Sequence, residues 1–341
     1  MAAPYVCGIV TIKYVAYATP TNSVFLSHAM LPTLLFNQVR SPAHFAAQLA
    51  PIPENRYDMR MKIFIAGDST FQYNNSSTYP MTGIGQMIPL FFTNLSQPDL
   101  AAHDINENPA ESPVTANSTG AGGTAENANN TARETVTFYN YARNGRSTKN
   151  FISEGRLRVI DSQISNGDFL FVIFGHNDQK ADDPNRYTAP DGEYKTNLRL
   201  FAQTAEKHGA YPVFFTPVAR RIFDETTHEA VNTLKSYSDA MKEFAAEEGY
   251  PLVDLSALSC ALLTKLGYEK SAKFYMGLKP GEYANYPEGR DDNTHLKPDG
   301  AFTFAGLCAQ GLIDVCGSWN GKNAEAYQKL ASFIRAPKPA E

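Results

Sequence analysis

The fold of this chain is decided by a run of six apolar residues at positions 169–174, with the sequence FLFVIF. Successive side chains of a strand point to opposite faces, so both faces of this strand must be covered. A strand of this kind is typical of the centre of a parallel sheet that carries helices on both sides. Outward from it, the pattern predicts further strands at 63–66, 137–142, 212–216 and 251–254, and helices at 84–92, 151–164, 194–208, 228–248, 256–266, 299–315 and 323–334.

This alternation of strands and helices predicts the fold class. Repeated strand–helix units build a parallel sheet with helices on both faces, because the crossover connections are right-handed and lie over the sheet. We therefore expect an α/β fold, a three-layer α/β/α sandwich around a five-stranded parallel sheet. In open sheets of this kind, ligands bind at the carboxyl ends of the strands.

Composition excludes several classes of protein. The 341 residues are 43% hydrophobic and carry a formal net charge of -5, which predicts no nucleic-acid or membrane partner. Four scattered cysteines, Cys7, Cys260, Cys308 and Cys316, form no Cys-x-x-Cys pair, and buried thiols are expected at Cys308 and Cys316. The N-terminal apolar run is interrupted by Lys13 and is a poor signal peptide, so we expect a cytoplasmic rather than a secreted protein.

The chain divides into three parts by pattern. Residues 1–58 have no clean period and are predicted to be an N-terminal extension outside the catalytic domain. Residues 59–335 contain all the predicted strands and helices, and residues 336–341 form a tail. Residues 101–135 are rich in Ala, Asn, Gly and Thr, so this segment is predicted to be a disordered insertion within the domain.

Polar residues gather after the predicted strands. They are found at 67–70 (GDST), 143–147 (RNGRS), 175–178 (GHND) and 217–221 (PVARR), and a further cluster at 291–295 (DDNTH) precedes a predicted helix. Each signal is weak alone. A Gly-Asp-Ser turn is also a common start of a helix, since Asp and Ser favour the N-cap. An acid three residues before a histidine recurs at Glu225 and His228, where no site is expected.

Together the clusters can supply one chemistry. Acyl transfer needs a hydroxyl nucleophile, an imidazole base, a carboxylate that orients the imidazole, and donors aimed at the oxyanion. Ser69 can supply the hydroxyl, and His295 can supply the base. Asp291 and Asp292 both precede that histidine and are alternative orienting carboxylates. The set therefore points to a serine esterase.

The four blocks carry a family resemblance. The sequence resembles the SGNH, or GDSL, hydrolases in a serine block at 67–69, a glycine block around Gly145, an asparagine block at 175–178 and a histidine block at 292–295. These blocks follow one another in the family's order over roughly residues 62–315. Within this superfamily, the residues of the blocks resemble more closely those of the rhamnogalacturonan acetylesterase-like group, carbohydrate esterase family twelve. The resemblance implies a flavodoxin-like SGNH hydrolase fold.

The resemblance also implies a role for each site residue. Ser69 is expected to attack the ester carbonyl, His295 to take its proton, and Asp292 to orient the imidazole. The backbone N–H groups of Ser69 and Gly145 and the side-chain amide of Asn177 are expected to form the oxyanion hole. The family spacing favours Asp292 over its neighbour as the orienting residue.

For the possible substrate-binding residues, the sequence allows two interpretations each. His176 is either a substrate contact or support for the loop that carries the oxyanion-hole asparagine. Arg220 and Arg221 either bind the carboxylate of an acidic sugar or form salt bridges within the scaffold. Ile84 stands where the resemblance leads us to expect Trp, which points to a changed substrate preference. No two histidines lie within five residues of each other, so neither a metal nor another cofactor is expected.

The function expected from these observations is removal of O-acetyl groups from plant cell-wall polysaccharide or its oligosaccharides. Rhamnogalacturonan, a pectin, is the first candidate substrate, and acetylated xylan is the second. An SGNH lipase or thioesterase acting on non-carbohydrate esters is an alternative with the same chemistry. A carbohydrate-binding protein without turnover is an alternative of another class.

Overall fold

The computed structural model describes residues 60–95 and 134–337. The predicted extension at 1–58, the predicted insertion at 101–135 and most of the tail lie outside these ranges, apart from residues 134 and 135. The strands are β1 (Arg60–Gly67), β2 (Thr135–Asn140), β3 (Phe169–Ile173), β4 (Tyr211–Phe215) and β5 (Leu252–Val253). The α-helices are α3 (Ile84–Met87), α4 (Thr148–Ser153), α5 (Arg156–Asp161), α6 (Lys195–Glu206), α7 (Lys235–Glu248), α8 (Leu255–Ser271), α9 (Pro298–Gly317) and α10 (Ala324–Ser332). Short helical turns are η2 (Ser76–Thr78), η3 (Ile88–Phe91), η4 (Pro190–Tyr194) and η5 (Ala272–Phe274).

The five strands form one parallel sheet in the order β2-β1-β3-β4-β5. The apolar run that decides the fold is β3, which pairs with β1 on one side and β4 on the other. All five β3 residues are buried. The predicted α/β class and the five-stranded parallel sheet are therefore confirmed.

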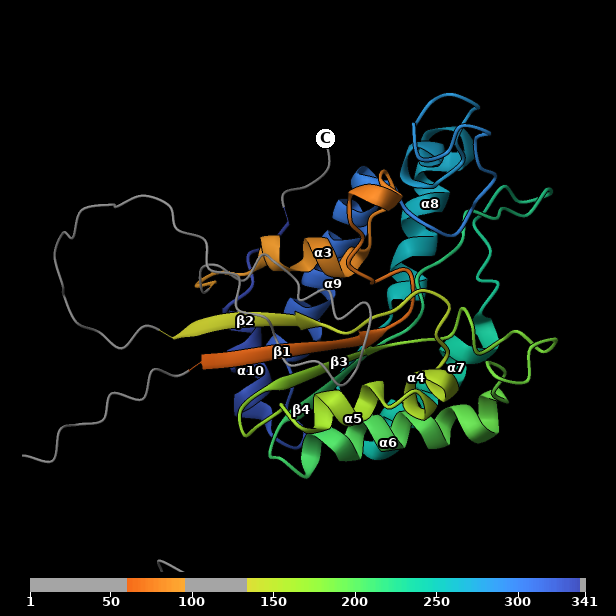
Figure 1. Cartoon of the computed structure of the whole chain (residues 1–341). Helices are drawn as coiled ribbons and strands as arrows, with labels where there is room; N and C mark the ends of the chain where they lie inside the picture. Colours follow the sequence, from red (N-terminus) through yellow and green to blue (C-terminus); the bar gives the residue numbers. More distant parts are fainter. Residues whose placement is uncertain (1–59, 96–133, 338–341) are drawn as a thin grey trace, which may run out of the picture. The chain divides into compact units, whose positions relative to one another are not determined.

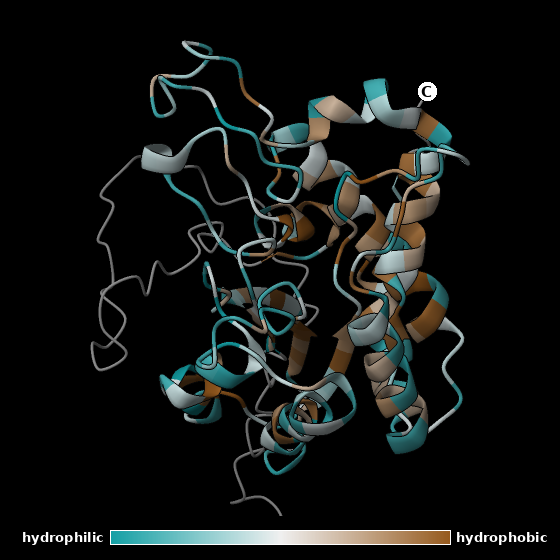
Figure 2. Cartoon of the chain, turned by 90° about the vertical axis from the view of Figure 1, so that its right-hand side faces the viewer, coloured by the Kyte–Doolittle hydropathy of each residue, from teal (hydrophilic) through white to brown (hydrophobic). Residues whose placement is uncertain are grey.

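Alternate residues of the strands face two separate cores. Ile63 and Ile65 of β1 face the core covered by α3, η3, α8, α9 and α10, whereas Phe64 and Ala66 face the core covered by α4, α5, α6 and α7. Figure 1 shows these two helical layers on opposite sides of the sheet. In Figure 2 the strands and the inner helices are largely brown, and the peripheral loops are mostly teal. This is the three-layer α/β/α sandwich that the sequence predicts.

Helix α9 is the longest helix of the described residues. By length and composition alone it is the one described helix that would suit a membrane span, yet more than half of its apolar stretch is buried. It packs against α3, α8 and α10. Cys308 and Cys316 lie on it as buried free thiols, as expected.

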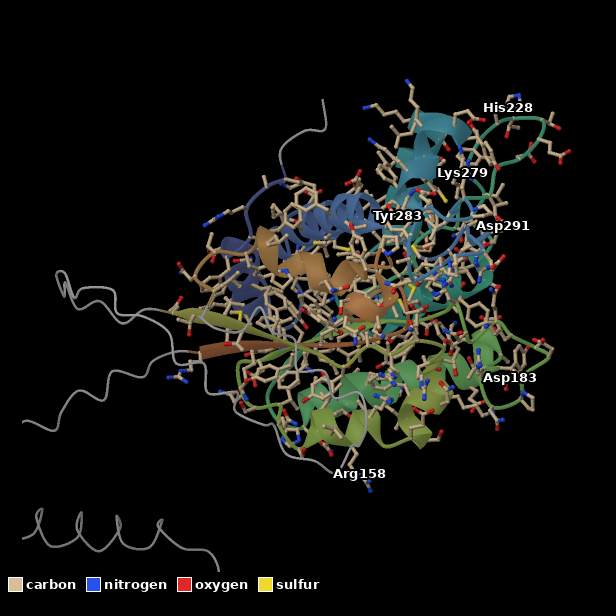
Figure 3. The ribbon with its side chains drawn as sticks, turned by 45° about the horizontal axis from the view of Figure 1, so that its top comes forward. Arg158, Asp183, His228, Lys279, Tyr283 and Asp291 are labelled. Carbon is tan, nitrogen blue, oxygen red and sulfur yellow. The ribbon has the colours of Figure 1, made fainter. Side chains whose placement is uncertain are left out.

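Two predicted helices differ from the structure. The predicted helix 151–164 is two helices, α4 and α5, separated by Gly155, whose φ of 77° is left-handed. The predicted helix 228–248 begins only at Lys235. The preceding residues form a hairpin-like loop, in which Phe223 and Ala230 are bridged and His228 has a φ of 56°. His228 is therefore exposed at a loop, as Figure 3 shows, and does not start a helix.

Candidate active site

Ser69 lies on the turn that follows β1. The preceding Asp68 is fully buried, and its Oδ1 accepts hydrogen bonds from the backbone N (2.9 Å) and Oγ1 (2.7 Å) of Thr70. Burial raises the pKa of the Asp68 carboxyl, and the bonds from Thr70 partly oppose that rise. The carboxylate thus closes the turn locally, and the serine is left at the carboxyl edge of the sheet.

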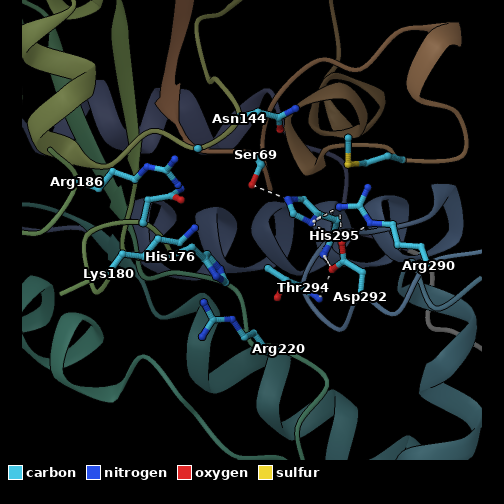
Figure 4. Close-up of a pocket in the computed structure, with 13 residues that line it drawn as sticks. Ser69, Asn144, His176, Lys180, Arg186, Arg220, Arg290, Asp292, Thr294 and His295 are labelled. Atoms are coloured by element: carbon cyan, nitrogen blue, oxygen red, sulfur yellow. Dashed lines mark hydrogen bonds and ion pairs between the residues drawn. The ribbon is translucent and has the colours of Figure 1, made fainter. Parts of the chain in front are cut away.

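His295 and Asp292 come from the loop before α9. Nε2 of His295 lies 2.9 Å from Oγ of Ser69, and Nδ1 of the same ring lies 2.7 Å from Oδ2 of Asp292. The backbone carbonyl of His295 also accepts a hydrogen bond from Met276 N at 2.9 Å. The structure therefore brings the three residues into one hydrogen-bonded chain, drawn with dashed lines in Figure 4.

The carboxylate of Asp292 is held from several directions. Its Oδ1 accepts from the backbone N–H groups of Thr294 and His295, both at 2.9 Å. Partial burial alone would raise the pKa of Asp292, but the hydrogen bonds and charge of His295 and these backbone donors bring it well below the ordinary value. The carboxylate therefore stays ionised beside the imidazole. The alternative Asp291 is exposed and labelled in Figure 3, and no described contact joins it to the ring.

Arg290 is a site residue that the sequence prediction missed. Its Nε and Nη2 lie 2.8 Å and 2.6 Å from Oδ2 of Asp292, the same oxygen that faces His295. The guanidinium also lies over the ring of Tyr286, 5.5 Å from the ring centroid. The carboxylate is therefore shared between an imidazole and a guanidinium. The sequence could have indicated this contact, because Arg290 lies only two positions before Asp292.

Gly145 and Asn177 line the same pocket as Ser69 and come from the loops after β2 and β3. Gly145 has a φ of 75°, a conformation that glycine adopts without strain. The side-chain amide of Asn177 is only 4% exposed and donates to the carbonyl of Arg146 at 3.1 Å. The bond to Arg146 orients the amide and leaves its second N–H for another acceptor. The backbone N–H of Asn144 donates to Oε1 of Gln72, which joins this loop to the turn after β1.

These residues surround a pocket of about 410 Å³. Its walls are mainly polar and charged, and they come from the loops after β1, β2, β3 and β4 and from the loop before α9. The lining residues are Ser69, Met81, Asn144, Gly145, His176, Asn177, Lys180, Arg186, Arg220, Arg290, Asp292, Thr294 and His295. Figure 4 shows this pocket from one side.

Only some of the residues predicted to contact the substrate line the pocket. His176 and Arg220 line the pocket, but Arg221 does not. The Arg221 guanidinium lies 3.7 Å from the centroid of the Tyr268 ring and donates to the Tyr268 carbonyl at 2.9 Å. It is held by the scaffold, so the structure does not support a substrate contact. Ile84 is fully buried in α3 and does not line the pocket, so a change of substrate preference through that position is not supported either.

Lys180 and Arg186 also line the pocket and were not predicted. Lys180 follows Asn177 closely in sequence, so its position after β3 was a usable signal. Arg186 lies further along the same loop, and nothing in the sequence places it beside Gly145. No group of three His, Cys, Asp or Glu side chains in the described ranges is arranged to hold a metal ion.

Comparisons with known proteins place the chain in a family. Residues 112–301 match the GDSL-like Lipase/Acylhydrolase family, a segment that contains Gly145, Asn177, Asp292 and His295 but begins after Ser69. The chain is 36% identical over 255 residues to the rhamnogalacturonan acetylesterase RhgT of Bacillus subtilis, which covers 75% of this chain and 90% of that protein. It is 23% identical over 195 residues to the rhamnogalacturonan acetylesterase of Emericella nidulans, which covers 52% of this chain and 74% of that protein.

Among solved structures, the protein YxiM of Bacillus subtilis shares the fold, with a TM-score of 0.55 and 21% identity. The alignment covers 76% of this chain and 58% of YxiM. The family match spans more than half of the chain, and the similarity to RhgT spans three quarters of it. The chain therefore belongs to the GDSL-like lipase/acylhydrolase family, and the resemblance to SGNH hydrolases is confirmed.

Proposed function

We propose that this protein is a serine esterase that removes O-acetyl groups from plant cell-wall polysaccharide or its oligosaccharides, with rhamnogalacturonan as the first substrate. One observation carries the chemistry: the hydrogen-bonded chain from Ser69 Oγ through the His295 ring to Asp292, at 2.9 Å and 2.7 Å, beside a pocket. The names of the similar esterases supply the acyl group and the carbohydrate.

In the proposed first step, Oγ of Ser69 attacks the carbonyl carbon of the acetyl ester while Nε2 of His295 takes the hydroxyl proton. Asp292 accepts the Nδ1 hydrogen bond, holds the ring in the required tautomer and stabilises the imidazolium. When the tetrahedral intermediate collapses, the bond from the carbonyl carbon to the sugar oxygen breaks. The sugar oxygen takes the proton from Nε2, and an acetylated serine remains.

In the second step, water attacks the acetylated serine and gives its proton to the same nitrogen. Collapse then breaks the bond between Oγ and the acetyl carbon, the proton returns to Oγ, and acetic acid is released and loses its proton to the solvent. The oxyanion of both intermediates is proposed to accept hydrogen bonds from the backbone N–H groups of Ser69 and Gly145 and from the Asn177 amide.

The pocket wall favours a small acyl group on a polar substrate. Met81 is its one large apolar side chain, and the other side chains are polar or charged. A lipase needs an apolar surface for a long acyl chain, because burial of each methylene group contributes about 0.8 kcal/mol. Among the side chains that line the described pocket, only Met81 would make a large apolar contact with such a chain. Acetylated xylan remains the second candidate substrate, since a neutral polysaccharide also presents polar esters.

The test of the chemistry is Ser69→Ala, assayed on 4-nitrophenyl acetate and on acetylated polysaccharides. We expect kcat to fall by about 10⁶-fold, because removal of the nucleophile removes the covalent route. Ser162→Ala, at an exposed position after α5, is the matched control and should keep full activity. Persistence of activity in a folded Ser69→Ala variant would exclude the proposed nucleophile.

The test of the substrate is acetate release across acetylated rhamnogalacturonan, acetylated xylan and acetylated oligosaccharides. We expect the highest kcat/KM on rhamnogalacturonan. In parallel, 4-nitrophenyl acetate and octanoate are compared. Preference for octanoate would replace the carbohydrate esterase with the lipase alternative.

A further inference from the structure

Two exposed tyrosines lie close to the pocket but do not line it. Tyr79 follows η2 and is 53% exposed, and its ring centroid lies 5.9 Å from that of Tyr283, with an angle of 69° between the two ring planes. Tyr283, labelled in Figure 3, is partly exposed and comes from the loop between η5 and α9. We call Tyr79 and Tyr283 the tyrosine pair.

An apolar cluster connects the tyrosine pair to the pocket. Met81 lines the pocket and is buried together with Met276 and Leu278. Tyr283 packs against this cluster from the side that is partly exposed. Tyr79 precedes Met81 by two residues, a path of at most about 7 Å. The tyrosine pair therefore lies beside the pocket, next to its Met81 wall.

Hydrogen bonds join the two loops that carry the tyrosine pair. The side-chain amide of Asn285 donates to the backbone carbonyl of Tyr79 at 2.8 Å. The hydroxyl of Tyr286 donates to the backbone carbonyl of Thr78 at 3.0 Å. The ring of Tyr286 is in turn covered by the guanidinium of Arg290, which lines the pocket. The two loops therefore present a preorganised aromatic surface, and little conformational entropy is lost when a ligand binds to it.

The chemistry of the tyrosine pair matches a sugar ring. The face of a tyrosine ring is apolar and carries partial negative charge, so it attracts the C–H groups on the face of a pyranose. The hydroxyl at the ring edge can donate to a sugar hydroxyl or accept from it. Two ring planes that meet at 69° cannot both lie parallel to one pyranose. One tyrosine would therefore stack on the face of the sugar while the other contacts its edge.

The size of the tyrosine pair fits a sugar better than a protein partner. A tyrosine side chain buries about 150–250 Å² when it is fully covered. Two tyrosines, one of them only partly exposed, therefore offer well below the ~800 Å² that each partner contributes to a stable protein interface. A single sugar residue, by contrast, has faces of about the size of an aromatic ring.

We propose that the tyrosine pair is a stacking subsite for the sugar residue next to the acetylated one. This inference rests on the proposed carbohydrate esterase function and extends its substrate from a single acetylated sugar to a chain of sugars. The acetylated residue lies over the pocket with its ester at Ser69, and the chain continues past Met81 onto Tyr79 and Tyr283. The tyrosine pair binds the substrate and takes no part in proton transfer.

The first experiment measures how activity depends on chain length. The kcat/KM for an acetylated rhamnogalacturonan tetrasaccharide is divided by the kcat/KM for an acetylated monosaccharide of the same polymer. We expect Tyr79→Ala to lower this ratio by about 5- to 10-fold, the usual worth of an aromatic contact, through a higher KM for the tetrasaccharide. Tyr283→Ala should lower the ratio in the same direction, and it is the second variant in case Tyr79→Ala does not fold.

Two further variants serve as controls. Tyr79→Phe keeps the ring and should keep the ratio within about 2-fold of that of the unmodified protein. Tyr268 lies on α8, is 55% exposed and does not line the pocket, so Tyr268→Ala should leave the ratio unchanged.

Three outcomes of this experiment would overturn the stacking subsite. The first is an unchanged ratio in folded Tyr79→Ala and Tyr283→Ala. The second is a loss of the same size in Tyr268→Ala, because any exposed tyrosine would then have the same effect. The third is an equal loss in Tyr79→Phe, because the hydroxyl rather than the ring would then bind the sugar.

The second experiment separates this inference from the proposed function. Binding of the deacetylated tetrasaccharide, which has no ester to react, is measured by isothermal titration calorimetry. We expect Tyr79→Ala to raise its Kd by about 5- to 10-fold. This result supports the subsite even if the acetylated saccharides prove not to be substrates. Equal Kd values, or no measurable binding to the unmodified protein, would overturn the subsite even if acetate is released from the polymer.

The third experiment tests a second copy of this chain as the alternative occupant. Sedimentation velocity is measured for the unmodified protein and for Tyr79→Ala. We expect the same sedimentation coefficient for both, because the tyrosine pair is too small to hold two copies together. A dimer that Tyr79→Ala loses would assign the tyrosine pair to a contact between copies and overturn the sugar subsite.

Discussion

At the scale of single residues, Asn177 offers the sharpest test of the oxyanion hole. Its amide is buried in the pocket wall and oriented by the carbonyl of Arg146. We expect Asn177→Ala to lower kcat on 4-nitrophenyl acetate by about 10²- to 10³-fold with little change in KM, because the bond strengthens as the oxyanion forms. Asn320→Ala, at an exposed position after α9, is the control. A folded Asn177→Ala variant with unchanged kcat would exclude the amide from this role.

Asp178, the next residue, is expected to make stability depend on pH. Its Oδ1 accepts from the N and Oγ1 of Thr148 and from Oγ1 of Thr188, while Oδ2 has no partner. Burial outweighs these bonds and raises the pKa of the carboxyl to about 7. Between the ordinary pKa near 4 and this value, the folded protein holds a proton that the unfolded chain releases. The free energy of unfolding therefore falls as pH rises through this window.

The variant Asp178→Asn keeps an acceptor oxygen but cannot ionise. We expect the melting temperature of the variant minus that of the unmodified protein to increase by about 2 °C or more from pH 5 to pH 8. This is the shift that ~1 kcal/mol produces in a domain of this size. The exposed Asp182→Asn is the control and should follow the unmodified protein. A relative melting temperature that does not change with pH would show that Asp178 is ionised throughout.

At the scale of elements, the start of α9 sets the position of His295. A Cβ on Gly300 would meet the carbonyl oxygen of Phe274 at 2.3 Å, and that carbonyl accepts from Lys297 N close to the histidine. We expect Gly300→Ala to lower the free energy of unfolding by about 1 to 3 kcal/mol, the usual cost of overpacking. It should also lower kcat, because the helix start and the His295 loop must shift together.

Gly317, the last residue of the same helix, is the matched control. A Cβ there meets Cβ of Ala331 at 3.7 Å, which is an ordinary contact. Gly317→Ala should therefore leave both stability and activity close to those of the unmodified protein. Denaturant unfolding and 4-nitrophenyl acetate turnover measure the two quantities. If Gly300→Ala and Gly317→Ala had the same stability and the same turnover, the start of α9 would not set the position of His295.

At the scale of the whole molecule, the sheet, both helical layers and the pocket are built from residues 60–95 and 134–337. We propose that residues 1–58 are dispensable for folding and catalysis. A chain that begins at Met59 should keep its melting temperature within ~2 °C, because no element of the described domain is removed. It should also keep its kcat/KM on 4-nitrophenyl acetate. An insoluble or inactive product would assign the extension to the domain.

Much of the fold could be predicted because strands and helices have a local signature. The five strands were recognisable from short apolar runs, and β3 at the centre was the clearest because both of its faces are buried. The helix boundaries were harder. The break between α4 and α5 lies at the left-handed Gly155, and α7 begins only after a loop that contains the left-handed His228. Hydrophobic periodicity carries no information about such turns.

Some residues of the site could be predicted from the sequence, and others could not. Ser69, Gly145, Asn177 and His295 follow predicted strands or precede a predicted helix, so the parallel sheet alone brings them to one edge. Their catalytic roles remain predictions, and the Ser69→Ala and Asn177→Ala variants test two of them. Arg290 and Arg186 were missed, and Arg221 lies away from the pocket although Arg220 lines it. Long, flexible side chains on loops take their direction from neighbours that are distant in sequence.

The sequence by itself determined the α/β class, the order of the strands along the chain, and which polar residues stand at strand ends. Those properties depend on the alternation of apolar residues, which is local. The resemblance already favoured Asp292 over Asp291. Only the tertiary structure decided that Arg290 shares the Asp292 carboxylate, and that Lys180 and Arg186 line the pocket. These features depend on which loops pack together across the sheet, and that is set by contacts between segments far apart in the chain.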